Sequence, residues 1–210
     1  MIYIENTYIC LAAPLFLAIL LVKKNWKRSL AFMLFGMTSC LLSSYVTTFF
    51  ARLLEADMTS ASYQIAPAVE EVIKFLPVLL YLLLFEPEKK NAVNGIIVVA
   101  VGFATFENVI FITQNGTSDL FKLLIRGFGT GAMHVLCAMM ISVGMFLLWD
   151  HTWLRMVGTF AVLCVAVTAH AIFNITVAQP GISLLVGAAI PLLLILIFIH
   201  VGREIFDRTI

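Results

Sequence analysis

Seven long apolar runs constrain the fold of this chain more than any other feature of its sequence. A helix needs about 20 apolar residues to cross the hydrocarbon core of a bilayer. The runs have roughly that length, and none shows the period-two alternation of barrel strands. They therefore predict an all-α, polytopic membrane helical bundle with about seven transmembrane helices, in which residues 1–210 form a single domain. The runs lie at residues 8–22, 29–51, 65–85, 92–113, 127–148, 156–178 and 182–201.

The composition agrees with a membrane protein and excludes several other classes. Hydrophobic residues make up 62% of the chain and charged residues only 12%, whereas about 25% of a soluble domain is charged. The net charge of +1 leaves no basic surface for nucleic acid. Four cysteines in apolar runs do not indicate a disulfide-stapled secreted fold. The expected surroundings are therefore the lipid bilayer, with no nucleic acid partner.

The distribution of lysine and arginine predicts the orientation of the bundle. Glu5 precedes the first run and basic residues follow it, which is the reverse of the charge order in a cleavable signal peptide. Short basic loops stay on the cytoplasmic side of a membrane. With seven spans, the main basic segments all fall on one side, at residues 23–28, 89–90, 155 and 203–208. We therefore expect a multi-pass protein of the cell (plasma) membrane with its N-terminus outside and its C-terminus cytoplasmic.

Polar residues inside the apolar runs are the strongest functional signal. A charge at the centre of a membrane helix costs about 2.5–3.5 kcal/mol on insertion scales, so these residues need one another or a wet cavity. At a rise of about 1.5 Å per residue, the glutamates and histidines among them all lie about 8–12 Å below the outer surface. The sequence thus predicts a site in the outer half of the bilayer. Its members are Glu70, Glu71, Lys74, Glu107, Asn108, His134, His170 and Asn174, with Arg126 at the outer mouth of the fifth run.

Helical spacing refines this prediction. His170 and Asn174 are four residues apart and share a helix face, as do Glu70 and Lys74. Pro77 lacks an N–H group and leaves the carbonyl of the residue four positions earlier without its helical partner. We expect a kink or a wet break in the third span beside the site.

Glutamates, histidines and an asparagine at one level favour hydrolysis of an acyl bond. A glutamate near a histidine can take a proton from water and return it to a leaving amine. A second histidine and an amide can stabilise the oxyanion. Alternatively, Glu71, His134 and His170 are candidate ligands for a catalytic zinc ion. The chain has no HExxH motif, and the cofactor stays open, because a glutamic mechanism needs no metal.

Four motifs in this region resemble the successive motifs of the PrsW intramembrane proteases. They are EEVIK at 70–74, FATFEN at 103–108, Arg126 followed by His134, and HAIFN at 170–174. The resemblance covers a motif-bearing core of about residues 65–178. The wider superfamily includes the CAAX-prenyl endopeptidases and Abi-type membrane proteins, which usually show FxxxH where this chain has Phe103 and Glu107. This difference favours PrsW. The superfamily is also similar to the APH-1 scaffold of γ-secretase, which is not catalytic.

The resemblance implies site-1 cleavage of a single-pass membrane protein near its extracytoplasmic face, as part of regulated intramembrane proteolysis. An anti-sigma factor is the known kind of substrate. By analogy, Glu71 is the expected water-activating base and Glu70 its partner. His134 would orient the water or bind metal, while His170 and Asn174 would stabilise the oxyanion.

The remaining polar residues receive supporting roles on the same analogy. Glu107 would act as an acid/base group or a ligand, Asn108 would position groups, and Lys74 would tune the glutamate pair. Three alternative functions stay open: a CAAX-type prenyl protease, a scaffold for another enzyme, and an ion- or proton-coupled transporter, since buried charged residues also mark ion pathways. The clustering of polar groups at one depth argues against the transporter.

Overall fold

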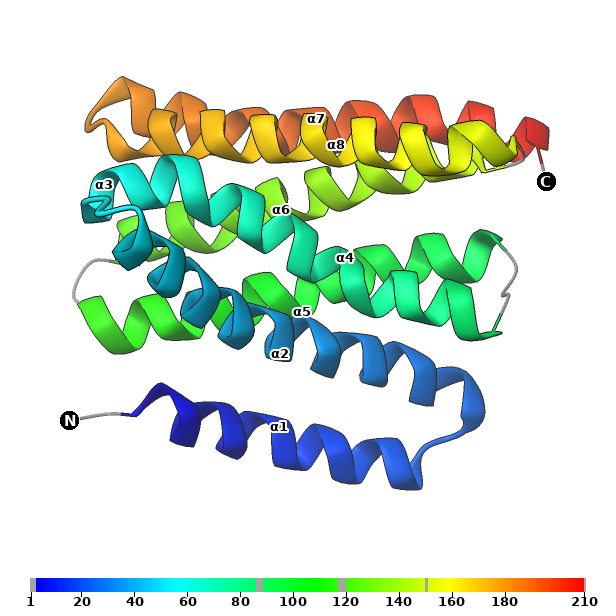
Figure 1. Cartoon of the computed structure of the whole chain (residues 1–210), viewed down its shortest axis with the longest axis horizontal. Helices are drawn as coiled ribbons and strands as arrows, with labels where there is room; N and C mark the ends of the chain where they lie inside the picture. The colour runs from blue at the N-terminus through cyan, green and yellow to red at the C-terminus, as the bar shows by residue number, and fades with distance from the viewer. Residues whose placement is uncertain (1–2, 86–88, 117–119, 150, 210) are drawn as a thin grey trace.

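The computed structural model describes residues 3–85, 89–116, 120–149 and 151–209, and within these ranges it contains helices and no strand (Figure 1). Each of the seven predicted runs lies almost wholly within one long helix, so the predicted all-α class is confirmed. The elements are α1 (Ile4–Leu21), α2 (Lys24–Leu53), α3 (Met58–Ser60), the π-helix η1 (Ala61–Ile65), α4 (Ala66–Phe85), α5 (Lys89–Asn115), α6 (Leu120–Leu148), α7 (Thr152–Ala178) and α8 (Ile182–Thr209).

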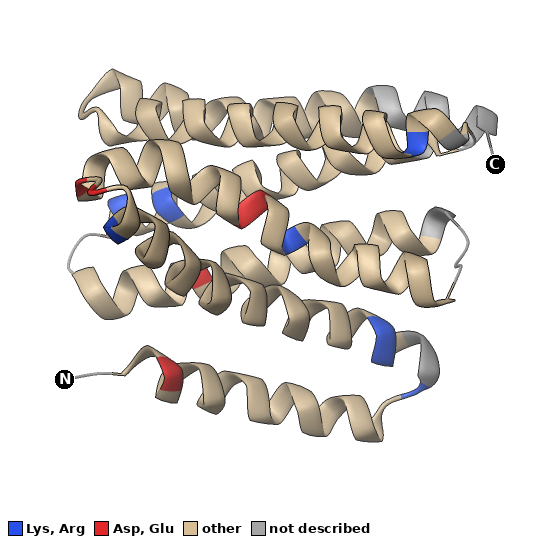
Figure 2. Cartoon of the chain, in the orientation of Figure 1, with Lys and Arg blue, Asp and Glu red and all other residues tan. Residues whose placement is uncertain are grey.

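Six helices in the described part of the chain are long and apolar enough to cross a membrane: α1, α2, α5, α6, α7 and α8. The remaining predicted span, at residues 65–85, corresponds to α4, whose 20 residues have the required length. Glu70, Glu71 and Lys74 all lie in α4. These three charged residues distinguish α4 from the other six helices, each of which contains a stretch of 18 residues with at most two. Figure 2 shows a small group of acidic and basic residues within the bundle, in addition to those near the helix ends.

The long helices run alternately in opposite directions, and the N- and C-termini lie at opposite ends of the bundle (Figure 1). α4 contacts α2, α5 and α7, and α5 in turn contacts α6. The largest apolar core lies among α2, α4, α5, α6 and α7; its buried members include Phe32, Val78, Val99, Met133 and Phe173. The four helices that carry the predicted site residues therefore enclose the centre of the molecule.

Two glycines bring α2 and α5 into direct backbone contact. A Cβ atom on Gly36 would lie 2.1 Å from the carbonyl oxygen of Val99, and one on Gly102 would lie 2.2 Å from that of Met33. No larger residue fits at either position without separating the helices. Close approach through small residues is a common mode of helix association in membranes.

α4 continues as a helix through Pro77, so the span has no break there, while the alternative, a kink, stays a prediction. The carbonyl of Ile73, which lacks its helical partner because of the proline, accepts a hydrogen bond from Ser39 Oγ of α2 at 3.4 Å. A neighbouring side chain thus takes the place of the lost N–H, as is usual for proline in membrane helices.

Candidate functional site

A continuous chain of hydrogen bonds connects α4, α5, α6 and α7 in the interior of the bundle. We call it the polar network. It consists of Arg126, Glu107, His134, Lys74, Glu71 and His170. Six of the nine residues that the sequence singled out therefore lie in one network, although they come from four different helices.

Lys74 connects the two halves of this network. Its Nζ donates to Glu71 Oε1 at 2.6 Å and lies 2.7 Å from His134 Nδ1. An ammonium group has donors only, so His134 Nδ1 accepts this bond and the imidazole carries its proton on Nε2. That nitrogen lies 2.5 Å from Glu107 Oε2 and donates to it. Glu107 Oε1 accepts a further bond of 2.5 Å from Arg126 Nη2.

His170 is oriented by the other half of the network. Its Nδ1 lies 2.8 Å from Glu71 Oε1, and a carboxylate can only accept, so Nδ1 carries the proton. The Nε2 of the neutral ring then presents a lone pair, and it lies 3.7 Å from Glu70 Oε2. That carboxylate oxygen is buried and has no hydrogen-bond partner among the described residues.

The charges in this region do not balance. Arg126 pairs with Glu107, and Lys74 pairs with Glu71, which leaves Glu70 without a cation of its own. With both imidazoles neutral, the group has two positive and three negative side chains. A buried carboxylate without a partner is costly. Glu70 therefore needs a proton, a bound cation or a polar ligand.

Aromatic rings enclose the network on one side. Phe103, which is buried, has its ring centre 4.9 Å from that of His134, and Lys74 Nζ lies 4.8 Å from the same ring centre. The rings of His134 and His170 meet edge to face at 5.1 Å. This packing fixes both imidazoles and excludes bulk water from around the ammonium group.

Three of these residues suit a metal ion. Glu70, His134 and His170 each offer one ligand atom, and the three atoms lie within 4.8 Å of one another. Two imidazoles and a carboxylate are a common ligand set for catalytic zinc, and the unpartnered oxygen of Glu70 fits this use. The sequence analysis named Glu71 as the carboxylate ligand, whereas the structure groups Glu70 with the two histidines. Both nitrogens of His134 are hydrogen-bonded, so ligation would replace one of those bonds.

The two asparagines lie outside the polar network. Asn174 Nδ2 donates to the carbonyl oxygen of Ser62 at 3.0 Å, so it joins α7 to the π-helix η1. Asn108 has a buried Oδ1 with no hydrogen-bond partner in the described part of the chain. The positioning role expected for Asn108 and the oxyanion role expected for Asn174 stay predictions.

Sequence reasoning missed the π-helix that precedes Glu70 and Glu71. π-Helical turns are rare and occur often at functional sites. η1 spans Ala61–Ile65, one turn before the glutamate pair, and nothing in its composition distinguishes it from an ordinary helical turn. The contact with Asn174 becomes visible only when α7 lies beside it. Phe103 was recognised as a motif position, but not as the ring that packs on Lys74 and His134.

Comparison with known proteins gives one result. No curated protein and no solved structure matched the chain. The family model described as PrsW family intramembrane metalloprotease matches residues 24–201, a range that contains every member of the polar network and most of the bundle. The match confirms the family suggested by the four motifs: the chain belongs to the PrsW family of intramembrane metalloproteases.

Proposed function

We propose that this protein is an intramembrane endopeptidase that makes a site-1 type cut in a single-pass membrane protein, near its extracytoplasmic face. An anti-sigma factor is the kind of substrate that the family resemblance suggests. The observation that carries the proposal is the pairing of a buried, unpartnered carboxylate oxygen on Glu70 with the lone pair of His170 at 3.7 Å. Two acceptors at this separation can both contact one water molecule.

In this mechanism Glu70 is the base. A water molecule held between Glu70 Oε2 and His170 Nε2 attacks the scissile carbonyl while Glu70 takes its proton. Glu70 then returns that proton to the leaving amine, which completes hydrolysis with no net change in the enzyme. The sequence pointed to Glu71 for this step. Glu71 Oε1, however, accepts bonds from both Lys74 and His170, which suits a group that orients His170.

The rest of the network holds the site in position. The bond from Nδ1 of His170 to Glu71 fixes the tautomer that turns Nε2 toward Glu70. His134 and Arg126 both donate to Glu107, which is therefore the anchor of α5 on α6. Asn174 uses one of its amide hydrogens on Ser62 and has a second to offer to an oxyanion.

A metal ion offers a second route to the same reaction, in keeping with the description of the family. Glu70, His134 and His170 would hold it. A bound metal activates water and polarises the substrate carbonyl. In that case Glu71 would still orient His170, because it contacts Nδ1, the ring nitrogen that does not face Glu70, and Lys74 would still hold Glu71.

The experiment that tests this function compares new N-termini in membranes from cells that express the wild type or Glu70→Gln at matched levels. We expect termini near the outer ends of single-pass spans that the variant does not produce. Glu55→Gln is the matched control, because Glu55 is exposed and lies outside the polar network. Repeating the assay with a chelator and then with added zinc separates the metal route from the glutamic one. Cleavage that survives Glu70→Gln, Glu71→Gln and Glu107→Gln alike would rule out this site.

A further inference from the structure

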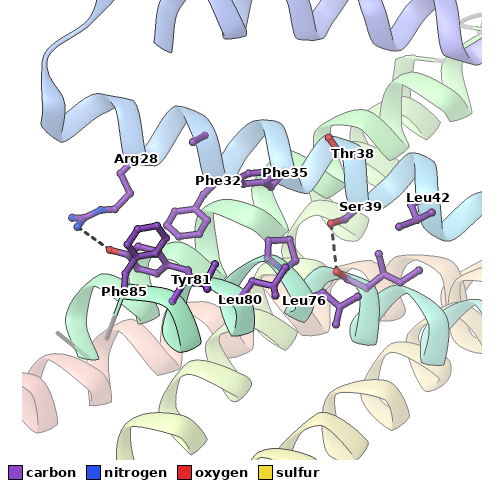
Figure 3. Close-up of a pocket in the computed structure, with 14 residues that line it drawn as sticks. Arg28, Phe32, Phe35, Thr38, Ser39, Leu42, Leu76, Leu80, Tyr81 and Phe85 are labelled. Atoms are coloured by element: carbon purple, nitrogen blue, oxygen red, sulfur yellow. Dashed lines mark hydrogen bonds between the residues drawn. The ribbon is translucent and has the colours of Figure 1, made fainter. Parts of the chain in front are cut away.

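A second feature lies on the outside of the bundle, in the cleft between α2 and α4. It is a groove of about 550 Å³ (Figure 3). Apolar side chains of both helices form its walls, among them Phe35 and Leu42 of α2 and Leu76 and Leu80 of α4. These four side chains are strongly exposed, so the groove opens toward the surroundings of the bundle. Its volume lies within the range of small-molecule sites, about 300–1,000 Å³.

The groove has the length of one membrane leaflet. It follows α2 from Arg28 to Leu42 and α4 from Ile73 to Phe85, which at about 1.5 Å per residue is roughly 18–21 Å. The whole hydrocarbon core measures about 30 Å, so a single leaflet is about 15 Å deep. An occupant that fills the groove therefore reaches from one membrane surface to about the midplane.

One end of the groove is charged and the other is not. At the charged end, Arg28 Nη1 donates to the Tyr81 hydroxyl at 3.4 Å (Figure 3), and Arg28 Nη2 donates to Asn91 Oδ1 at 2.7 Å. A guanidinium has five N–H groups, so these bonds leave three for a ligand. No carboxylate in the described part of the chain pairs with Arg28. Lys23 and Lys27 are exposed near the same end of α2.

At the opposite end the polar groups are already used within the protein. Ser39 Oγ donates to the carbonyl of Ile73. Thr38 Oγ1 donates to the carbonyl of Leu34 at 2.9 Å and bonds to the Tyr8 hydroxyl at 2.6 Å. The groove thus offers hydrogen-bond donors and positive charge at its membrane-surface end, and an apolar surface along the rest of its length.

We propose that this groove binds an anionic phospholipid, with one acyl chain between α2 and α4 and the phosphate on Arg28. The pattern of an apolar channel one leaflet long and a cation at its surface end matches such a lipid, and basic clusters beside membrane helices attract anionic headgroups. A transmembrane helix fits less well. It is about 10 Å wide and needs about 30 Å to span, and it would fill roughly 1,500 Å³ over the length of the groove. The proposal does not depend on the proposed function.

Native mass spectrometry of the full-length, delipidated protein tests the headgroup. The protein is titrated in detergent with dioleoyl phosphatidylglycerol or dioleoyl phosphatidylcholine. We expect one phosphatidylglycerol to bind more tightly than phosphatidylcholine, and Arg28→Gln to weaken phosphatidylglycerol about fivefold, the equivalent of about 1 kcal/mol for one charge. Arg52→Gln is the matched control, since it removes an exposed arginine from the last turn of the same helix. Glycerol phosphate, which has no acyl chain, is expected not to compete.

Filling the groove tests the acyl chain. Ala31→Trp narrows it from α2, and Leu80→Trp narrows it from α4, so that one variant remains if the other does not fold. Both are expected to lose most of the binding of either lipid, while Leu193→Trp, on an exposed face of α8, retains it. Equal affinity for the two lipids, equal effects of Arg28→Gln and Arg52→Gln, or competition by glycerol phosphate would each overturn the proposal. So would a groove that retains a single-span helical peptide and no phospholipid.

Discussion

Glu70 and Glu71 are adjacent in the chain but stand in different chemical situations. The Glu71 side chain is 2% exposed and accepts bonds from Lys74 and His170. The Glu70 side chain is 17% exposed, and its buried Oε2 has no partner among the described residues. Neutralising the two carboxylates should therefore have different consequences, although a sequence comparison treats them as one motif.

Replacing Glu70 should remove activity and leave the fold intact. We expect Glu70→Gln to lower cleavage by about 10²–10⁴-fold, the usual contribution of general acid–base catalysis, with little change in the thermal unfolding temperature. Glu71→Gln should lower both cleavage and the unfolding temperature. It leaves the buried ammonium of Lys74 without its carboxylate, at a cost of about 3–5 kcal/mol. Cleavage assays and unfolding scans of the same purified proteins check this. Wild-type stability in Glu71→Gln would contradict the ion pair.

Lys74 and Glu71 should depend on each other for stability. Lys74→Met alone leaves Glu71 buried without its cation, whereas the double variant Lys74→Met/Glu71→Gln removes both charges. We expect the double variant to be more stable than the sum of the single effects indicates, with a coupling energy of about 0.5–3 kcal/mol. Unfolding free energies of the four proteins form the required double-mutant cycle. Additive losses would show that the two groups do not interact.

At the scale of elements, the contact between α2 and α5 depends on the absence of two side chains. Gly102→Ala would place a methyl group against the Met33 carbonyl and should cost about 1–3 kcal/mol, the usual cost of overpacking. Gly127→Ala is the matched control, since it changes a helical glycine at which an added methyl group would meet nothing within 4 Å. Thermal unfolding of both variants measures the difference. Equal unfolding temperatures for Gly102→Ala and Gly127→Ala would show that α2 and α5 can move apart at no cost.

The π-helix should be held in place by the amide of Asn174. Asn174→Leu removes the donor to the Ser62 carbonyl, a bond worth about 0.5–1.5 kcal/mol. We expect faster hydrogen exchange across η1 and the first turn of α4, together with reduced cleavage. Peptide-resolved exchange with mass spectrometry detects the change. Exchange that stays at the wild-type rate would assign the stability of η1 to other contacts.

At the scale of the whole molecule, the long helices and the six residues that meet in the polar network were predictable, and the hydrogen-bond partners of those residues were not. All seven long helices were predicted from apolar length, including α4, although its three charges keep it apart from the six helices apolar enough to cross a membrane. The sequence cannot show which carboxylate pairs with Lys74. Glu70 and Glu71 precede it by four and three residues, and both spacings bring side chains together on a helix. The Ser62–Asn174 bond and the glycine contacts between α2 and α5 join positions far apart in the chain, and no local pattern marks them.

The orientation predicted from the basic loops can be tested on the intact bundle. The connection between α2 and α3, which contains Glu55, and the connection between α6 and α7, which contains His151, lie at opposite ends of the bundle (Figure 1). We expect a cysteine at Glu55→Cys to react with a membrane-impermeant thiol reagent in intact cells, and one at His151→Cys to react only after permeabilisation, because basic loops stay inside. The reverse labelling pattern would show that the protein has the opposite orientation in the membrane, with the site near the cytoplasmic face.

The glycine seam between α2 and α5 also has a mechanical consequence. Helices whose backbones touch cannot rotate or slide past one another without steric clashes. We therefore expect α2 and α5 to move together as one rigid unit. A substrate that reaches Glu70 in the proposed reaction would therefore have to displace a different helix. α4 contacts α2 and α5 on one side and α7 on the other, so we expect the movement that admits a substrate to occur on the α7 side.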